Sequence, residues 1–180
     1  MGVALHEDSI VVRRPIAQVF AFVANPANDW LWHTPVVEVR QTSLGPVGVG
    51  TTFAGIYDPK KRTLDSPVHP NSLQAIEGVL VEVDPERSSR LRVRFVNPPR
   101  GLGARVLGPA FDLTFRFEAV PGGTRVYRGG ELNPWSLMRP LVRLLLSLNA
   151  KRFQYLLGLL RDAIERLPPI DTADRSPLRS

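Results

Sequence analysis

The sequence contains no cysteine, which excludes disulfides and thiolate metal sites and fits a reducing compartment such as the cytoplasm. It has only three histidines, His6, His33 and His69, and none stands at metal-ligand spacing from another or beside a carboxylate cluster. We therefore expect neither a metal nor another cofactor. Long apolar runs are lacking, because stretches such as Leu144–Leu146 are far too short to cross a bilayer. The start, MGVALHEDS, lacks the pattern of a secretory signal, so a cytoplasmic protein is expected.

Motifs of several other functional classes are also missing. The net charge is +6, but the basic residues, nearly all arginines, are scattered along the chain and not gathered into one block. This pattern favours solvated surface charge, and no nucleic-acid partner is expected. The glycine-rich segment Gly45–Gly50 lacks the lysine of a phosphate-binding loop and precedes a predicted strand, so we interpret it as a turn or lid. No G-x-S-x-G motif occurs.

What remains is the composition of one globular domain, with 43% hydrophobic and 22% charged residues over 180 positions. We expect this domain over residues 1–167 and a disordered, proline-containing tail over 168–180. Hydrophobic periodicity and turn residues predict seven strands, two small helices after the first strand, and one long final helix. The predicted strands cover residues 9–14, 36–41, 51–57, 72–83, 90–96, 110–119 and 124–132. The first predicted helix starts at Pro15, and the other two cover residues 27–32 and 136–167.

The final predicted helix, over residues 136–167, is about 45 Å long and must bury its apolar stripe against the sheet. Two polar residues, Asn149 and Arg152, fall within that stripe. For Asn149 two interpretations stay open, a contact with a ligand in a pocket or a bend of the helix. For Arg152 we favour a side chain that extends to solvent. The stripe itself comprises Met138, Leu141, Leu145, Leu156, Leu160, Ala163 and Leu167.

Four segments occur in an order that is unlikely to arise by chance: SIVVRRPIAQVFAFVANPANDWLWH, GPVGVGTTF, VEVDPERSSRLRVRF and FRFEAVPGGTRVYR. Through them the chain resembles the SRPBCC superfamily, which includes START lipid-transfer domains and the birch-pollen allergen fold. More narrowly, it resembles the polyketide cyclase/dehydrase-like branch. The resemblance covers about residues 8–167. It implies an α+β helix-grip fold, in which a seven-stranded antiparallel sheet wraps a long C-terminal helix around a deep apolar cavity.

The resemblance implies a protein that binds a small hydrophobic molecule, such as a lipid, a polyketide or another ring-containing compound. A polyketide cyclase or dehydratase is the alternative, although the superfamily has no invariant catalytic residue to transfer. A lipid carrier with transient contact to a membrane surface is the second alternative. It would dock through Lys60–Arg62 and the start of the last helix at Trp135–Arg143. A monomer and a homodimer both stay open.

Weak candidates for acid–base chemistry are His33, Tyr57, Glu77 and Arg128. Alternation in the last strand sends either Arg128 or Tyr127 inward, depending on the register. If the valine-rich end of the 72–83 strand faces inward, Glu77 does so too, and a buried pair with Arg128 becomes one interpretation. A surface salt bridge of Glu77 is the favoured one. For His33 we favour a capping or surface role.

The predicted ligand pocket is lined mainly by apolar residues at inward positions, with a few polar anchors. The Gly45–Gly50 and Pro98–Gly108 loops are expected to act as its gates. The predicted lining residues are Trp32, Phe53, Tyr57, Val79, Phe95, Phe115, Arg128, Met138, Leu145, Asn149 and Phe153.

Overall fold

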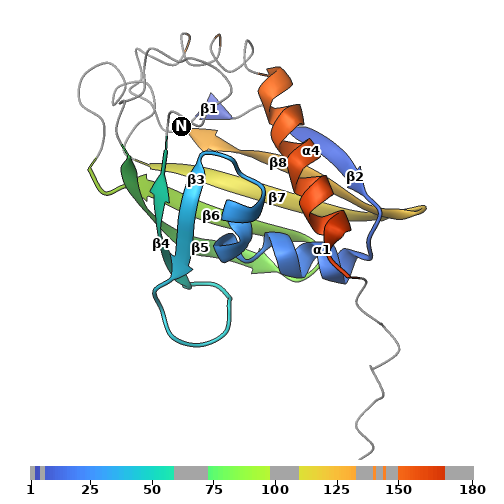
Figure 1. Cartoon of the computed structure of the whole chain (residues 1–180), viewed down its shortest axis with the longest axis horizontal. Helices are drawn as coiled ribbons and strands as arrows, with labels where there is room; N and C mark the ends of the chain where they lie inside the picture. Colours follow the sequence, from blue (N-terminus) through green and yellow to red (C-terminus); the bar gives the residue numbers. More distant parts are fainter. Residues whose placement is uncertain are drawn as a thin grey trace, which may run out of the picture.

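The computed structural model describes residues 3–4, 7–58, 73–97, 110–132, 140, 144 and 150–168. The strands are β1 (Val3–Ala4), β2 (Asp8–Val12), β3 (Val36–Gln41), β4 (Thr52–Tyr57), β5 (Gln74–Asp84), β6 (Ser88–Phe95), β7 (Ala110–Val120) and β8 (Gly123–Leu132). They form one antiparallel sheet in the order β1-β8-β7-β6-β5-β4-β3 (Figure 1). Both β1 and β2 pair with β8, opposite successive segments of it.

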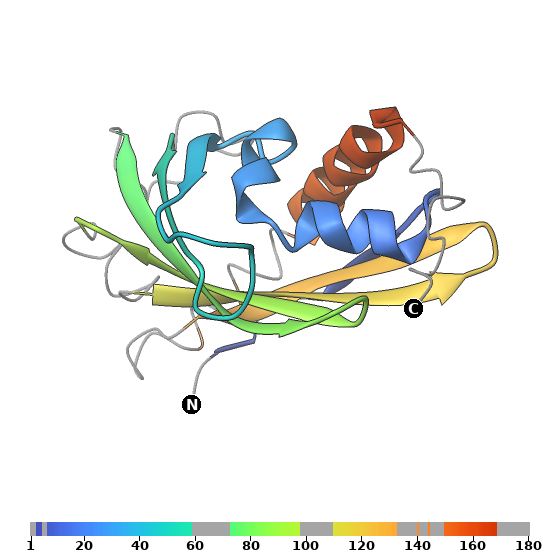
Figure 2. The same cartoon turned by 90° about the horizontal axis from the view of Figure 1, so that it is seen from below.

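Three helices are described, all on the concave side of the curved sheet (Figure 2): α1 (Ile16–Val23), the 3-10 helix η1 (Pro26–Leu31) and α4 (Ala150–Arg166). Pro15 directly precedes α1, and Pro26 opens η1, where a missing N–H costs no intrahelical bond. The side chain of Asn25 accepts a hydrogen bond from the Ala27 N–H at 3.1 Å and caps η1.

The predicted helix-grip fold is confirmed. The seven predicted strands correspond to β2–β8, and the two-residue β1 is an addition that the sequence did not suggest. The second small helix has 3-10 geometry. The long final helix is confirmed as α4 over 150–166, while its predicted start over 136–149 lies outside the described residues except for Pro140 and Leu144.

The hairpin between β7 and β8 shows how local sequence sets the register of the sheet. Val120 pairs with Gly123, so the turn consists of Pro121 and Gly122 alone. Gly122 has φ +82°, a conformation that glycine adopts without strain. Gly123 has no room for a side chain, because an added Cβ would lie 2.1 Å from the carbonyl oxygen of Val12 on the neighbouring strand.

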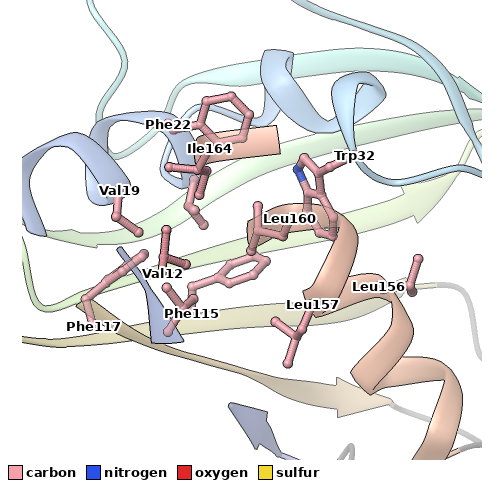
Figure 3. Close-up of a cluster of buried hydrophobic side chains, with 12 residues drawn as sticks. Val12, Val19, Phe22, Trp32, Phe115, Phe117, Leu156, Leu157, Leu160 and Ile164 are labelled. Carbon is pink, nitrogen blue, oxygen red and sulfur yellow. The ribbon is translucent and has the colours of Figure 1, made fainter. Parts of the chain in front are cut away.

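The hydrophobic core joins α1 and α4 to one half of the concave face (Figure 3). The sheet contributes the inward side chains of β2, β7 and β8, and α4 contributes residues three to four positions apart along one stripe. Leu156 and Leu160 of the predicted stripe are buried, whereas the fully buried Leu157 and Ile164 were not part of that prediction. The core consists of Val12, Val19, Phe22, Val23, Trp32, Phe115, Phe117, Val126, Leu156, Leu157, Leu160 and Ile164.

The C-terminal end of α4 is fastened to the junction between β2 and α1. The Arg14 guanidinium donates to the carbonyl oxygens of Glu165 and, at 3.0 Å, Leu167, and the Gln18 side-chain amide donates to Pro168 at 2.9 Å. The carboxylate of Glu165 in turn accepts from the Arg13 backbone N–H at 2.8 Å. These bonds satisfy carbonyls that a helix end leaves without intrahelical partners, and they fix where α4 meets the sheet.

No helix within the described ranges is both long and apolar enough to cross a membrane.

Replacing Leu160 by alanine tests the core. Leu160 is fully buried between α4 and the sheet. We expect Leu160→Ala to lower the free energy of unfolding by about 2–5 kcal/mol, because the substitution removes transfer energy and leaves a cavity. The matched control, Leu44→Ala, alters a fully exposed leucine and should change stability by less than about 0.5 kcal/mol. Urea denaturation measures both, and equal effects would contradict this assignment of the core.

Candidate functional site

The register of the sheet decides which side chains face the helices. Arg128 of β8 lies directly opposite Phe115 of β7, and Val126 lies opposite Phe117. Because both phenylalanines belong to the core beneath α4, Val126 and Arg128 point inward, and Tyr127 points outward. Of the two registers that the sequence left open, the structure has the one that buries Arg128, whose exposed fraction is 5%.

A bulge in β5 reverses the predicted orientation of its N-terminal half. Pairing between β5 and β6 shifts between Leu80 and Glu82, so alternation does not run unbroken along the strand. Leu80 therefore faces inward, whereas Glu77 and Val79 lie on the outer face. Glu77 forms its ion pair there with Arg94. The favoured interpretation of Glu77 as a surface salt-bridge residue thus agrees with the structure, and the buried pair with Arg128 does not.

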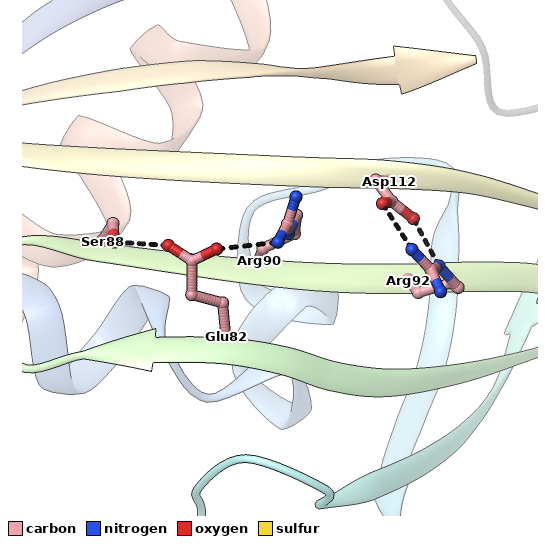
Figure 4. Close-up of polar contacts among 5 residues, drawn as sticks. All are labelled: Glu82, Ser88, Arg90, Arg92 and Asp112. Atoms are coloured by element: carbon pink, nitrogen blue, oxygen red, sulfur yellow. Dashed lines mark hydrogen bonds and ion pairs between the residues drawn. The ribbon is translucent and has the colours of Figure 1, made fainter. Parts of the chain in front are cut away.

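Arginines on the outer face of the sheet pair with carboxylates of the neighbouring strands (Figure 4). Arg90 pairs with Glu82 at 2.9 Å, and Arg92 donates two hydrogen bonds to Asp112, at 2.8 and 3.0 Å. With the pair of Arg94 and Glu77, each outward arginine of β6 has a carboxylate on a neighbouring strand. The pairs of Arg90 with Glu82 and of Arg94 with Glu77 are exposed at both partners and contribute only about 0–1 kcal/mol each, whereas the carboxylate that binds Arg92 is buried.

Besides Arg128, which is buried, the predicted lining residues fall into four groups. Trp32, Phe53 and Phe115 are buried on the concave side. Tyr57 and Phe95 are half-buried on the same face, where Phe95 contacts Phe111 with ring centroids 6.1 Å apart. Val79 lies on the outer face. The side chains of Met138, Leu145, Asn149 and Phe153 lie outside the described residues, as do the Pro98–Gly108 gate and the proposed membrane-docking segments.

The concave face carries a second apolar region, beyond the core that α1 and α4 cover. Phe53 of β4, Leu80 of β5 and Val93 of β6 are all buried there, yet none of them belongs to the core cluster. These strands lie toward the end of the sheet away from α4 (Figures 1 and 2). The inward surface is thus divided into the packed core and a separate apolar region.

A polar cluster lies within the concave side, at the core residues Trp32 and Phe115. Its members are Asp29 of η1, Arg128 of β8 and Trp32, which directly follows η1. The Arg128 guanidinium lies 5.9 Å from the centre of the Trp32 ring, and the edge of Phe115 packs against that ring at 6.4 Å. His33 stacks on Trp32 at 5.2 Å. Two of the residues proposed from the sequence, His33 and Arg128, are therefore brought together around Trp32.

Asp29 is the residue of this cluster with the most altered acidity. Burial raises the pKa of Asp29 from its ordinary value of 3.8 to about 7. The positive charge of Arg128 and then the indole N–H of Trp32 act in the opposite direction and lower this pKa in part. Asp29 is consequently able to gain or lose a proton near neutral pH, as a general acid or base requires.

The Trp32 indole N–H is a buried donor without a regular hydrogen bond. Trp32 is 4% exposed, and none of the described residues places an acceptor in hydrogen-bonding geometry at its Nε1. The carboxyl of Asp29 is close enough to be affected by this N–H but does not meet that geometry. The donor therefore has unused hydrogen-bonding capacity beside Asp29 and Arg128.

The arrangement suits an organic ligand better than a metal. Across the described residues, no group of three or more histidine, aspartate or glutamate side chains is positioned to hold a metal ion. Two donors, one carboxyl and several aromatic rings instead combine a few polar groups with apolar surroundings, which is typical of sites for organic molecules.

Residues 5–165 match the family model described as polyketide cyclase/dehydrase and lipid transport. The chain belongs to this family. The sequence interpretation that placed it in the polyketide cyclase/dehydrase-like branch is thereby confirmed. Among curated proteins, none matches the sequence significantly.

Solved structures show the same fold at low sequence identity. The Zhui aromatase/cyclase from a Streptomyces species is 13% identical, with a TM-score of 0.63 over 92% of this chain and 95% of that one. A protein from Nitrosomonas europaea is also 13% identical, with a TM-score of 0.62 over 91% and 94%. Ara h 8.0201 is 11% identical, with a TM-score of 0.58 over 91% and 98%. At such identities these likenesses establish the fold of this family member and not its ligand.

Sequence reasoning missed Asp29. The residue lies in the short helix between Asn25-Pro26 and the tryptophans, where an acidic side chain is common and reads as a solvent-facing group near a helix start. The one available signal was its position next to the apolar pair Trp30 and Leu31. That signal does not reveal Arg128, which is 99 positions away in the sequence and reaches Asp29 only through the sheet.

The raised pKa of Asp29 predicts a pH dependence of stability. The folded protein binds the Asp29 proton more tightly than the unfolded chain does. The stability that this proton binding contributes is complete below about pH 4 and is lost as pH rises through about 7. Between about pH 5 and 8, we expect the unfolding free energy of the wild type to fall by roughly 2–3 kcal/mol relative to Asp29→Asn.

Urea titrations at several pH values measure this difference, and using a difference cancels the titration of every other group. Asp84→Asn is the control, because Asp84 is an exposed carboxylate at the end of β5. Parallel pH profiles for the wild type and Asp29→Asn would show that Asp29 has an ordinary pKa.

Proposed function

We propose that this protein binds a small hydrophobic, ring-containing molecule between the concave face of the sheet and the helices. The observation that carries the proposal is the second apolar region, formed by Phe53, Leu80 and Val93 away from the core beneath α4. Ligand sites are mainly apolar surfaces with a few convergent polar groups. Here the cluster of Asp29, Trp32 and Arg128 provides such groups on the same side of the sheet.

Membership of the family supports this proposal. The family description names both lipid transport and polyketide cyclisation or dehydration, and each of these requires a protein to accommodate a largely apolar molecule. One structural relative is an aromatase/cyclase, and it aligns with 92% of this chain. The fold common to both proteins provides the concave sheet and the C-terminal helix that such a site needs.

An enzyme of the cyclase or dehydratase type is the second candidate function. The observation that favours it is Asp29, whose pKa of about 7 suits proton transfer at neutral pH and whose neighbour Arg128 would stabilise a developing negative charge. Of the groups considered from the sequence, Glu77 lies on the outer face with Arg94, so it does not share a site with Arg128. Incubation with a linear poly-β-ketone thioester tests this function, and loss of water detected by mass spectrometry, abolished in Asp29→Asn, would support it.

Native mass spectrometry of the purified protein, followed by organic extraction, tests the binding function directly. A stoichiometric apolar compound that is released on denaturation is the expected result. The recovered compound, or 2-naphthol as a substitute ring probe, then allows affinities of variants to be compared by fluorescence.

Two valine substitutions separate the two faces of the sheet. Val93 of β6 faces inward and Val79 of β5 faces outward, while the two strands are neighbours. We expect Val93→Phe to lower the affinity for the ring probe by roughly tenfold or more, because the larger side chain occupies ligand space, corresponding to about 1.4 kcal/mol or more. Val79→Phe should leave the affinity within about twofold of the wild type. Equal affinities in both variants would place the ligand elsewhere.

A further inference from the structure

The polar cluster has a donor and acceptor pattern that fits one oxygen atom of a ligand. Trp32 has an indole N–H that can only donate, and Arg128 has a guanidinium that can only donate. Asp29 accepts hydrogen bonds when it is ionised and donates one when it is protonated. These three groups come from η1, the residue after it and β8, and the fold brings them together on the concave side of the sheet.

We propose that Asp29, Trp32 and Arg128 form the polar anchor of the ligand site and bind a single hydroxyl or carbonyl oxygen of an otherwise apolar, ring-containing molecule. This inference rests on the proposed binding function and specifies which part of the ligand is recognised. Trp32 Nε1 donates to the ligand oxygen. Asp29 accepts a hydrogen bond from the ligand when it is ionised and donates one to the ligand when it is protonated.

The first support is the buried N–H of Trp32. A buried donor without a hydrogen bond is unfavourable, and native proteins contain few of them. Trp32 is 96% buried, given its exposed fraction of 4%, and its N–H has no regular acceptor within the described ranges. A ligand oxygen at this position would satisfy the donor and would lie beside both Asp29 and the aromatic rings of the cluster.

The second support is the chemistry of Asp29. Ionised Asp29 accepts a hydrogen bond, so it favours a hydroxyl group that donates to it while accepting from Trp32. Protonated Asp29 gains an O–H donor while its carbonyl oxygen still accepts, so all three groups are then able to donate to one ligand oxygen, which favours a carbonyl oxygen. Because the pKa of Asp29 lies at about 7, both forms of the anchor exist at physiological pH. We therefore expect the anchor to favour a ring hydroxyl above about pH 7 and a ring ketone below it.

Other ionisable groups around the cluster are few. His33 stacks on Trp32, and Asp8 of β2 lies opposite Arg128 in the sheet, where its carboxylate accepts a hydrogen bond from Gln154 of α4 at 2.7 Å. The strand packed against η1, β3, carries Glu38 and Arg40, which are exposed. Helix α1, which also contacts η1, contains no ionisable residue. Among these groups, His33 is the one with an ordinary pKa near neutrality, so the test must isolate the contribution of Asp29.

Two matched probes provide that test: 2-naphthol, which presents a ring hydroxyl, and 2-acetylnaphthalene, which presents a ketone on the same ring system. Affinities are measured by fluorescence titration between about pH 5.5 and 8.5. As Asp29 ionises, we expect the affinity for 2-naphthol to rise and that for 2-acetylnaphthalene to fall, each by roughly tenfold.

Variants assign the effect to the anchor. In Asp29→Asn the amide both donates and accepts at every pH, so the opposite pH trends of the two probes should disappear. Titration of His33 would remain in this variant and is thereby separated from that of Asp29. Trp32→Phe keeps an aromatic ring against Phe115 and Arg128 but removes the N–H. This variant should lower the affinity for both probes roughly three- to tenfold, while the opposite pH trends remain. Asp84→Asn is the control and should behave as the wild type does, and thermal melts verify that each variant is folded.

The outcomes separate the anchor from the proposed function. Opposite trends in the wild type that vanish in Asp29→Asn support the anchor. Binding of both probes with flat or parallel pH profiles, or with opposite trends that persist in Asp29→Asn, overturns the anchor but leaves the binding function standing. Should Asp29→Asn fail to fold, unchanged affinities in Trp32→Phe overturn it. Failure of the wild type to bind either probe overturns the binding function and the anchor with it.

Discussion

The burial of α4 against the concave face of the sheet is the constraint on which the rest of the structure depends. Leu157, Leu160 and Ile164 are fully buried, so the stripe of α4 has no solvent-facing alternative. The helix must also end at a defined place, because Arg14 and Gln18 bind its last carbonyl groups. Packing and anchoring together fix the helix over β2 and its neighbours, and they determine which half of the sheet becomes packed core.

The division of the concave face follows from that placement. A helix over β2, β7 and β8 leaves the inward side chains of β4, β5 and β6 outside the core that it forms. The polar cluster is attached to the core side through Trp32 and Phe115, and Arg128 comes from the middle of β8. Placing the buried Arg128 beside the half-buried Asp29 is seldom favourable for stability alone. Desolvation raises the pKa of Asp29 by more than the positive charge of Arg128 lowers it.

The two faces of the sheet have separate roles. Arginines of β6 point outward at every second position and pair with carboxylates of β5 and β7, which keeps the convex face solvated. The inward positions that alternate with these arginines, such as Ser89 and Val93, are buried. Alternation with period two therefore gives one strand both a charged outer row and a buried inner row. The paired arginines of this strand thus all lie on the outer surface.

Much of the fold follows from local sequence alone. The alternation of phenylalanines with polar residues in Phe111–Glu118 identifies a strand with one buried face, and Pro121-Gly122 defines a two-residue hairpin that sets the register between β7 and β8. The apolar period of the last helix correctly indicates its buried face at Leu156 and Leu160. These features are determined locally because backbone sterics and hydrophobic periodicity act over a few residues.

The site depended on tertiary structure. Alternation cannot show where a bulge interrupts a strand, and the bulge after Leu80 placed Glu77 and Val79 on the outer face. It also cannot choose between two registers, and only the packing of Val126 beneath α4 turned Arg128 inward. Asp29 reads as an ordinary surface carboxylate until β8 brings Arg128 beside it. Its acidity is set by desolvation and by charges that are distant in sequence, and these exist only once the chain has folded.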